Sequence, residues 1–232
     1  MRPQRRSHGF TLMETALATV IIGVGVLAVM QAQQSFLQQN NWSTNSSTAT
    51  YLANEIREMS SVFPRHDRFS GGIFFATPGD PATFTGWGPE TGEMLTQDID
   101  DLDDLDGAVF GSATTFPTGF TMTRRYPGPI NAFGDVIPET MYDGTTETFT
   151  PVGSQVPVDV PMRGWTQIVQ VNKVDPYDLG TNVANSAELV SAGQVLRRVD
   201  RYPLRVTVTV LYSPDANTPA VEVTSINWVA MP

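Results

Sequence analysis

The chain has 232 residues, enough for one ordinary soluble domain together with one long additional helix. Its 24 acidic side chains outnumber 14 Lys and Arg, so the formal net charge is −10. An acidic exterior of this kind argues against direct nucleic-acid binding through a broad basic surface. The sequence contains no cysteine, which excludes both disulfide bonds and thiol catalysis.

The N-terminus combines a short basic leader with a long apolar run. Residues 1–9 carry three arginines: Arg2, Arg5 and Arg6. Residues 10–30 follow, and Glu14 is their only charged side chain. A helix of this length spans roughly 30 Å, the thickness of a bilayer's hydrocarbon core. A cleavable secretory signal has a shorter apolar core of about 7–15 residues and ends at an A-x-A-like site, which is missing here. We therefore expect a retained membrane helix, with the arginine-bearing end in the cytoplasm.

Glu14 is the exception within this run. No other charged side chain follows it until Glu55. A carboxylate in a membrane-spanning segment costs free energy on insertion, and such residues generally have a function and a partner. Two interpretations are open from position alone. Glu14 has a functional role inside the apolar environment, or it lies at headgroup level and its carboxylate reaches water.

A family resemblance bears on this choice. Residues 9–14 read Gly-Phe-Thr-Leu-Met-Glu, after the basic leader and before the charge-free run. This arrangement resembles the class III signal of type IV prepilins and type II secretion pseudopilins, and the resemblance covers about the first 60 residues. It implies that prepilin peptidase cleaves between Gly9 and Phe10 and N-methylates Phe10. It also implies that Glu14 neutralises the N-terminal amine of a neighbouring subunit, and such a pair attracts strongly in a low dielectric.

Within that family, the sequence resembles minor pilins and pseudopilins more than major pilins. No proline occurs between Pro3 and Pro64, whereas major pilins often carry one in this helix. Residues 23–28 and 51–59 resemble the PilV-like and I-type pseudopilin branch. The resemblance implies a single-pass protein of the bacterial inner membrane with a periplasmic or otherwise extracytoplasmic head domain. Its partners would be the peptidase and other pilins or pseudopilins, which it would contact through the N-terminal helix in a pilus or pseudopilus.

Residues 31–63 predict an amphipathic continuation of the helix. Small and apolar residues recur at steps of three and four: Ala49, Leu52, Ala53, Ile56, Met59 and Phe63. The weak point is residues 40–48, because Asn, Ser and Thr favour caps and turns over helix interiors. We expect a kink or local melting there. Pro64 predicts the end of the helix.

The remaining sequence predicts a head domain in two parts. Residues 64–160 are rich in Gly, Pro, Thr and Asp and predict a loop-rich variable region with short strands, the clearest at residues 116–126. Residues 161–232 predict an antiparallel sheet, with strands at 165–174, 204–212 and 220–230. Such a sheet can cover the apolar stripe of the helix. The expected fold class is α+β, and the resemblance implies a pilin-like arrangement of helix and head.

An acidic segment lies in the first of these parts. It packs six aspartates into nine positions: Asp98, Asp100, Asp101, Asp103, Asp104 and Asp106. Oxygen-rich segments can hold Ca²⁺, but the EF-hand order of ligands is not met. We expect a solvated acidic loop, and calcium binding by this loop is the alternative.

Other residue types give little sign of chemistry. His8 lies in the leader, so His66 is the single histidine of the mature chain. One histidine without cysteine supports no catalytic constellation and no zinc site. Four arginines near the last strands predict ordinary ion pairs within the head, a contact with a neighbouring subunit being the alternative: Arg197, Arg198, Arg201 and Arg205. Three tryptophans predict core or half-buried sheet positions: Trp87, Trp165 and Trp228.

Two functions from different classes follow from these patterns. The first is a minor pilin or pseudopilin subunit without catalytic activity, cut after Gly9 and assembled by helix packing. The second is a signal-anchored envelope protein whose extracytoplasmic domain binds a ligand or partner. Glu14 separates them, because its replacement should impair assembly in the first case and be neutral or favourable for anchoring in the second. A membrane-tethered hydrolase lacks the residues it would need.

Overall fold

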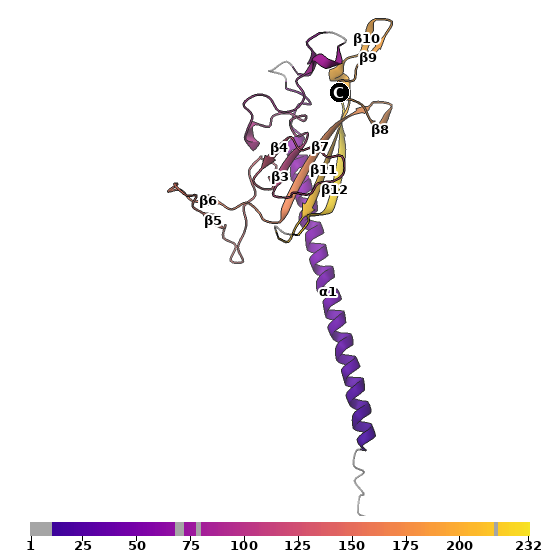
Figure 1. The fold of residues 1–232 in the computed structure, drawn as a ribbon, viewed down its shortest axis with the longest axis vertical. Helices are drawn as coiled ribbons and strands as arrows, with labels where there is room; N and C mark the ends of the chain where they lie inside the picture. Colours follow the sequence, from indigo (N-terminus) through magenta and orange to yellow (C-terminus); the bar gives the residue numbers. More distant parts are fainter. Residues whose placement is uncertain (1–10, 68–71, 78–79, 216–217) are drawn as a thin grey trace, which may run out of the picture. The chain divides into compact units, whose positions relative to one another are not determined.

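The computed structural model describes residues 11–67, 72–77, 80–215 and 218–232 (Figure 1). The chain divides into two compact units, Met1–Asn45 and Ser46–Pro232, which are considered separately. One α-helix, α1 (Leu12–Ser60), contributes to both units. Among the described residues it is the one helix that is long and apolar enough to cross a membrane. The predicted cleavage site between Gly9 and Phe10 lies outside the described residues.

Helix α1 continues without interruption through residues 40–48, so the predicted local melting there is wrong, while the predicted kink stays a prediction. The polar side chains of this stretch bond to carbonyls of the helix itself. Thr44 Oγ1 donates to the carbonyl of Asn40 at 3.0 Å. Just beyond this stretch, Thr50 Oγ1 donates to the carbonyl of Ser46 at 2.8 Å. Back-bonding to the i−4 carbonyl satisfies each hydroxyl without leaving the helical conformation, which is why a Ser/Thr-rich stretch is tolerated.

The main sheet lies entirely in the second unit. It has the strand order β12-β11-β7-β3-β4, and β8 pairs with β7 (Figure 1). The strands are β3 (Ala108–Gly111), β4 (Arg124–Tyr126), β7 (Trp165–Asp175), β8 (Asp178–Asn182), β11 (Leu204–Tyr212) and β12 (Val221–Ala230). All pairings are antiparallel except that of β3 with β4. The three strands predicted in the C-terminal part are confirmed as β7, β11 and β12.

Two strands of the sheet come from the loop-rich part, which the sequence did not assign to it. All four residues of β3 are buried. The strand predicted at residues 116–126 is wrong except for β4 at its end. Its first half turns instead, because Pro117 and Gly119 stand in it. Gly119 adopts φ +84°, and the amide of Phe120 donates to the carbonyl of Pro117 at 3.2 Å.

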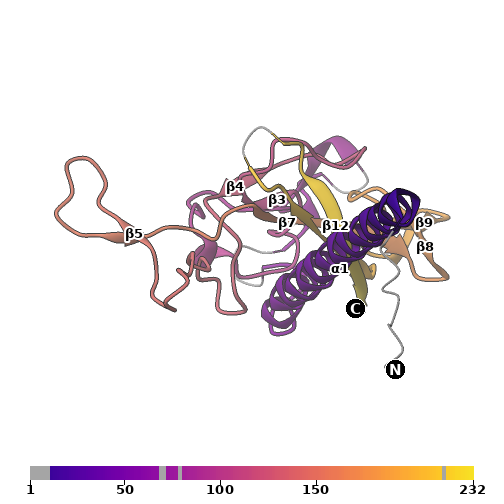
Figure 2. The same cartoon turned by 90° about the horizontal axis from the view of Figure 1, so that it is seen from below.

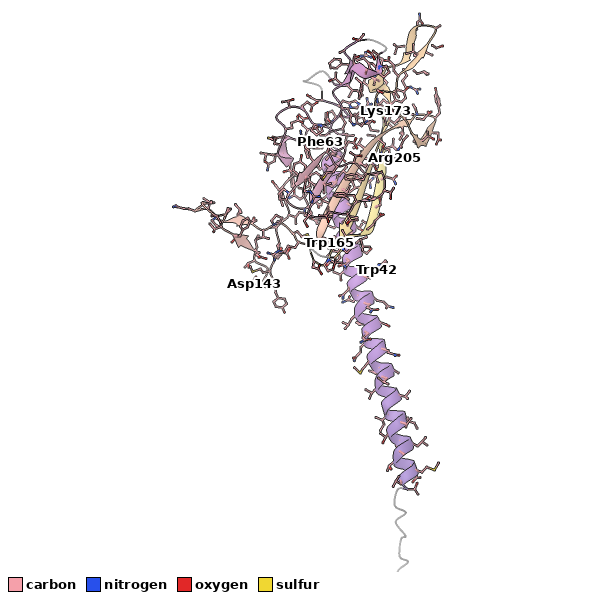
Figure 3. The ribbon with its side chains drawn as sticks, viewed as in Figure 1. Trp42, Phe63, Asp143, Trp165, Lys173 and Arg205 are labelled. Atoms are coloured by element: carbon pink, nitrogen blue, oxygen red, sulfur yellow. The ribbon has the colours of Figure 1, made fainter. Side chains whose placement is uncertain are left out.

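Short elements surround the sheet. Three two-stranded ribbons pair β1 (Phe74–Phe75) with β2 (Phe84–Thr85), β5 (Thr148–Phe149) with β6 (Val158–Asp159), and β9 (Leu189–Ser191) with β10 (Gln194–Arg197). Single 3₁₀ turns occupy η1 (Pro81–Thr83), η2 (Thr96–Asp98) and η3 (Val199–Arg201). The ribbon of β5 and β6 extends away from the sheet (Figure 1), and Asp143 lies in a turn of the chain before β5 (Figure 3).

The core of the second unit joins the C-terminal turns of α1 to the sheet (Figure 2). Five of the six residues of the predicted stripe are buried: Ala49, Leu52, Ala53, Ile56 and Met59 are at most 4 % exposed. The helix ends at Ser60, three residues earlier than predicted, and Phe63 is half-buried against the same core. The buried stripe belongs to one cluster with alternate residues of β11, from Leu204 to Val210. Full burial of a side chain such as Ile56 contributes about 1.5–3 kcal/mol. A helix packed on a mostly antiparallel sheet is an α+β fold, as expected.

Candidate functional site

The part of α1 in the first unit exposes apolar side chains on all sides. Each of the following is at least 53 % exposed: Leu12, Met13, Leu17, Val20, Ile21, Ile22, Val24, Val26, Leu27, Val29, Met30, Phe36, Leu37 and Trp42. Trp42 projects from the helix (Figure 3). Soluble proteins rarely expose a continuous apolar surface of this extent, and such surfaces mark contacts with a membrane or with other proteins. This segment is therefore the first candidate site.

Glu14 lies in the first turn of α1 and is held by Thr11. The backbone amide of Thr11 donates to Glu14 Oε2 at 2.9 Å, and the Thr11 hydroxyl donates to the same oxygen at 3.1 Å. The amide of Glu14 in turn donates to Thr11 Oγ1 at 3.3 Å. This reciprocal pattern is a capping box, and a carboxylate there also interacts favourably with the positive end of the helix dipole. The Thr-x-x-Glu spacing signals this cap in the sequence, although our sequence analysis did not use it.

The second unit fixes the C-terminal turns of α1 with polar contacts as well as apolar ones. Gln167 of β7 is fully buried, and its Nε2 donates to the carbonyl of Leu52 at 2.8 Å. The same amide group donates to the carbonyl of Ile130 at 3.0 Å and accepts from its backbone amide at 2.8 Å. Glu55 Oε2 accepts from the amide of Ala132 at 2.6 Å. These contacts set the helix in one register against the head.

The acidic segment is the second candidate site, and the expectation of a solvated loop is wrong for three of its residues. Asp101, Asp103 and Asp104 are only 1–2 % exposed. Buried carboxylates are rare in proteins unless they are paired or bind a cation. The segment folds inward because Leu102 and Leu105, which alternate with the aspartates, enter the core at 2 % and 0 % exposure. Because these leucines are buried, the aspartates next to them in the sequence are buried as well.

Asp103 and Asp106 connect this segment to neighbouring loops and strands. Asp103 Oδ1 lies 2.7 Å from His66 Nδ1, and its Oδ2 accepts from the amide of Gly88 at 3.0 Å. Asp106 accepts from Trp87 Nε1 at 3.0 Å and, through its other oxygen, from the amide of Val171 on β7 at 3.0 Å. Burial raises the pKa of Asp103 to about 7 and lowers the pKa of His66 to about 4. The bonds stabilise the fold, and burial keeps His66 in its neutral form at neutral pH.

Lys173 is a further buried ionisable group that the sequence analysis did not single out. It is 0 % exposed, on β7, and its Nζ donates to the carbonyl of Asn185. Three aromatic rings lie 5.5–5.7 Å from the ammonium group, those of Phe84, Trp87 and Tyr202. Burial lowers the pKa of Lys173 to about 8. Figure 3 shows Lys173 among the loops at the end of the sheet. Rings at these distances stabilise the cation.

The four arginines near the last strands contact other groups of the head, and two of them form the expected ion pairs, whereas Arg197 lies over the rings of Tyr177 and Tyr202. Arg198 and Arg201 both pair with Asp200, at 3.5 and 3.6 Å. Arg205 donates to the carbonyls of Leu179 (3.1 Å) and Gly180 (3.2 Å) on β8. Trp165 is buried, and Trp87 and Trp228 are half-buried against the core, which confirms those predictions.

Comparison with known proteins identified no relative of this chain. A scan against models of protein families, a search of curated proteins and a search of solved structures each found no match. Any function must therefore be argued from the chain's own residues. The two features that call for a function are the exposed apolar helix with its single carboxylate and the buried acidic segment.

Proposed function

We propose that this chain is a minor pilin or pseudopilin subunit that is anchored in the bacterial inner membrane and assembled into a type IV pilus or a type II secretion pseudopilus. One observation carries the proposal. Helix α1 is exposed and apolar on all sides from Leu12 to Met30, and Glu14 is the single charged side chain between Phe10 and Glu55. In the sequence Glu14 stands four residues after Phe10, which directly follows Gly9.

A helix with this surface suits two environments in turn. In the membrane its side chains face lipid, and the arginines of residues 1–9 keep the leader in the cytoplasm. After removal of the leader, the same side chains pack against the helices of neighbouring subunits in a filament core. Both environments exclude water, so the helix needs no polar face in either.

Glu14 supplies the specific contact in the second environment. Cleavage after Gly9 leaves a cationic amine on Phe10, four residues before Glu14 in the sequence. In a filament the amine of one subunit meets Glu14 of the next, and their attraction is much stronger in a low dielectric than in water. An unpaired charge at such a site is strongly unfavourable. Glu14 therefore favours the correct stagger between neighbouring subunits, in addition to capping its own helix.

The test compares three Glu14 variants in cells that carry prepilin peptidase and the partner subunits. Glu14→Val removes the carboxylate, Glu14→Gln keeps its size, and Glu14→Asp keeps its charge. We expect all three to enter the membrane and to be cleaved, but Glu14→Val and Glu14→Gln to be lost from sheared filaments. Glu14→Asp should retain part of the assembly. Glu58→Gln removes an exposed carboxylate from the head-domain part of the same helix and serves as the control.

The outcomes separate the two classes of function. Assembly lost in Glu14→Val, with normal assembly of Glu58→Gln, supports a filament subunit. Normal assembly or improved anchoring of Glu14→Val contradicts the proposal and favours an envelope protein that uses the helix only as an anchor. Processing is followed by gel mobility in the same samples, so a failure of cleavage is not mistaken for a failure of assembly.

A further inference from the structure

One oxygen of the buried acidic segment has no protein partner. Asp104 is 2 % exposed, and its Oδ2 accepts a long bond of 3.2 Å from the amide of Asp100. Its Oδ1 is buried and has no hydrogen-bond partner among the described residues. A buried carboxylate oxygen without a donor is costly, and native proteins generally satisfy such atoms with a donor, water or an ion.

The other aspartates of the segment do not share this feature. Asp101 Oδ1 accepts from the amides of Asp103 (2.9 Å) and Asp104 (3.0 Å). Both oxygens of Asp103 and both of Asp106 have partners, as described above. The orphaned oxygen is therefore specific to Asp104, and it is not a general property of a crowded acidic loop.

Further carboxylates surround Asp104 at distances suited to a metal ion. Asp104, Glu90 and Glu93 each place one oxygen within 4.8 Å of the others, and so do Asp104, Asp100 and Asp101. Ligand oxygens at 2.3–2.6 Å from Ca²⁺ are at most about 5 Å apart, so either group fits one coordination sphere. Asp104 belongs to both groups and joins them.

The charge balance points the same way. Among the described residues, the cation that hydrogen bonds to this region is Arg124, whose Nη2 donates to the carbonyl of Glu90 at 3.3 Å. One guanidinium does not balance five carboxylates. Burial and the neighbouring Asp101 raise the pKa of Asp104 to about 8, which reflects this excess of negative charge. A cavity of about 300 Å³ is lined by Glu93 of this cluster together with Arg124, Arg125 and Tyr126.

From this geometry we infer that Asp104, together with Glu90, Glu93, Asp100 and Asp101, forms a binding site for a divalent cation of the calcium type. The donors are all oxygens, without imidazole or thiolate, which selects a hard cation over zinc or copper. The ion joins the loop before η2 to the loop after it and so fixes residues 90–104 on the core. The inference goes beyond the proposed function and does not depend on it.

The experiment uses the purified full chain in mild detergent, freed of metal with EDTA and dialysed. Thermal unfolding is measured in EDTA, in CaCl₂ and in MgCl₂, and CaCl₂ binding is measured by calorimetry. We expect Ca²⁺ at about 100 times its dissociation constant to raise the unfolding temperature by about 5–10 °C. Mg²⁺ should have a smaller effect, because it demands a tighter octahedral shell.

Two variants locate the site. Asp104→Asn should abolish the calcium-dependent shift, yet unfold in EDTA at the same temperature as the wild type or higher, because it replaces a buried carboxyl group that lies among other carboxylates. Glu93→Gln, whose side chain is half-buried, should lower the calcium affinity at least about tenfold. Asp159→Asn on β6, an exposed position, is the control and should respond like the wild type.

Two results would overturn the inference. The first is a wild-type chain that unfolds at the same temperature in EDTA and in CaCl₂ and gives no binding heat. The second is an Asp104→Asn chain that responds to calcium as the wild type does. If Asp104→Asn fails to fold, a Glu93→Gln chain that binds calcium with wild-type affinity would overturn the inference instead. None of these readouts involves cleavage or assembly, so the fate of this inference is separate from that of the proposed function.

Discussion

Replacement of Gln167 by leucine should loosen the attachment of α1 to the head more than any change of similar size on the same strand. The leucine keeps the volume of the side chain but removes three hydrogen bonds, to the Leu52 carbonyl and to both backbone groups of Ile130. Each bond contributes about 0.5–1.5 kcal/mol net, and the buried Ile130 amide left without an acceptor costs about 1–3 kcal/mol. The extra apolar burial of leucine offsets part of this loss. We expect the free energy of unfolding to fall by about 3 kcal/mol, and the unfolding temperature by about 6–12 °C.

The assay is urea unfolding of the full chain in mild detergent, followed by tryptophan fluorescence, since Trp165 is buried next to this site on β7. Gln170→Leu is the matched control, because Gln170 lies on the same strand, points to the opposite face and is half-buried. It should change stability by less than about 1 kcal/mol. Equal losses for Gln167→Leu and Gln170→Leu would refute the reasoning, since the helix-to-sheet bonds would then carry no special weight.

Two further predictions concern the second unit. Ile56→Ala, at the centre of the buried stripe, should lower the free energy of unfolding by about 2–5 kcal/mol; Val62→Ala, 80 % exposed, should leave it nearly unchanged, and a similar loss in both variants would contradict the packing described. Lys173→Met should alter the pH dependence of stability. The pKa of Lys173 is lowered to about 8 in the folded chain, so above that pH the unfolded chain binds more protons than the folded chain. The stability of the wild type should therefore rise relative to that of Lys173→Met between about pH 8 and 10.5. Urea unfolding at both ends of this range measures the difference, and parallel curves for the two proteins would show that Lys173 is not desolvated.

Much of the fold is readable from periodic patterns. The stripe from Ala49 to Met59 repeats at helical spacing, and residues 204–212 alternate as a strand should, so both were predicted with nearly the observed bounds. Residues 40–48 show where such reasoning fails. Propensity alone disfavours their helix, but hydroxyl bonds to the i−4 carbonyls, as from Thr44, remove much of the penalty.

The buried polar residues were harder to predict, because burial of a polar side chain depends on partners far away in the sequence. Gln167 and Lys173 lie on the same face of β7 as Val169 and Val171, and that alternation is the one local signal of their burial. Their partners, Leu52 and Asn185, give no such signal. The acidic segment was expected to be solvated for the same reason. The two leucines within it draw three aspartates inward, and a count of charges does not reveal this.

The processing of the N-terminus tests the central proposal most directly. The chain should be expressed in cells with an active prepilin peptidase, extracted from the membrane and analysed by mass spectrometry, intact and after digestion. The account predicts a mature chain that begins at Phe10 and carries one methyl group on its amine. A chain that retains Met1 and the three arginines of the leader in those cells would contradict it.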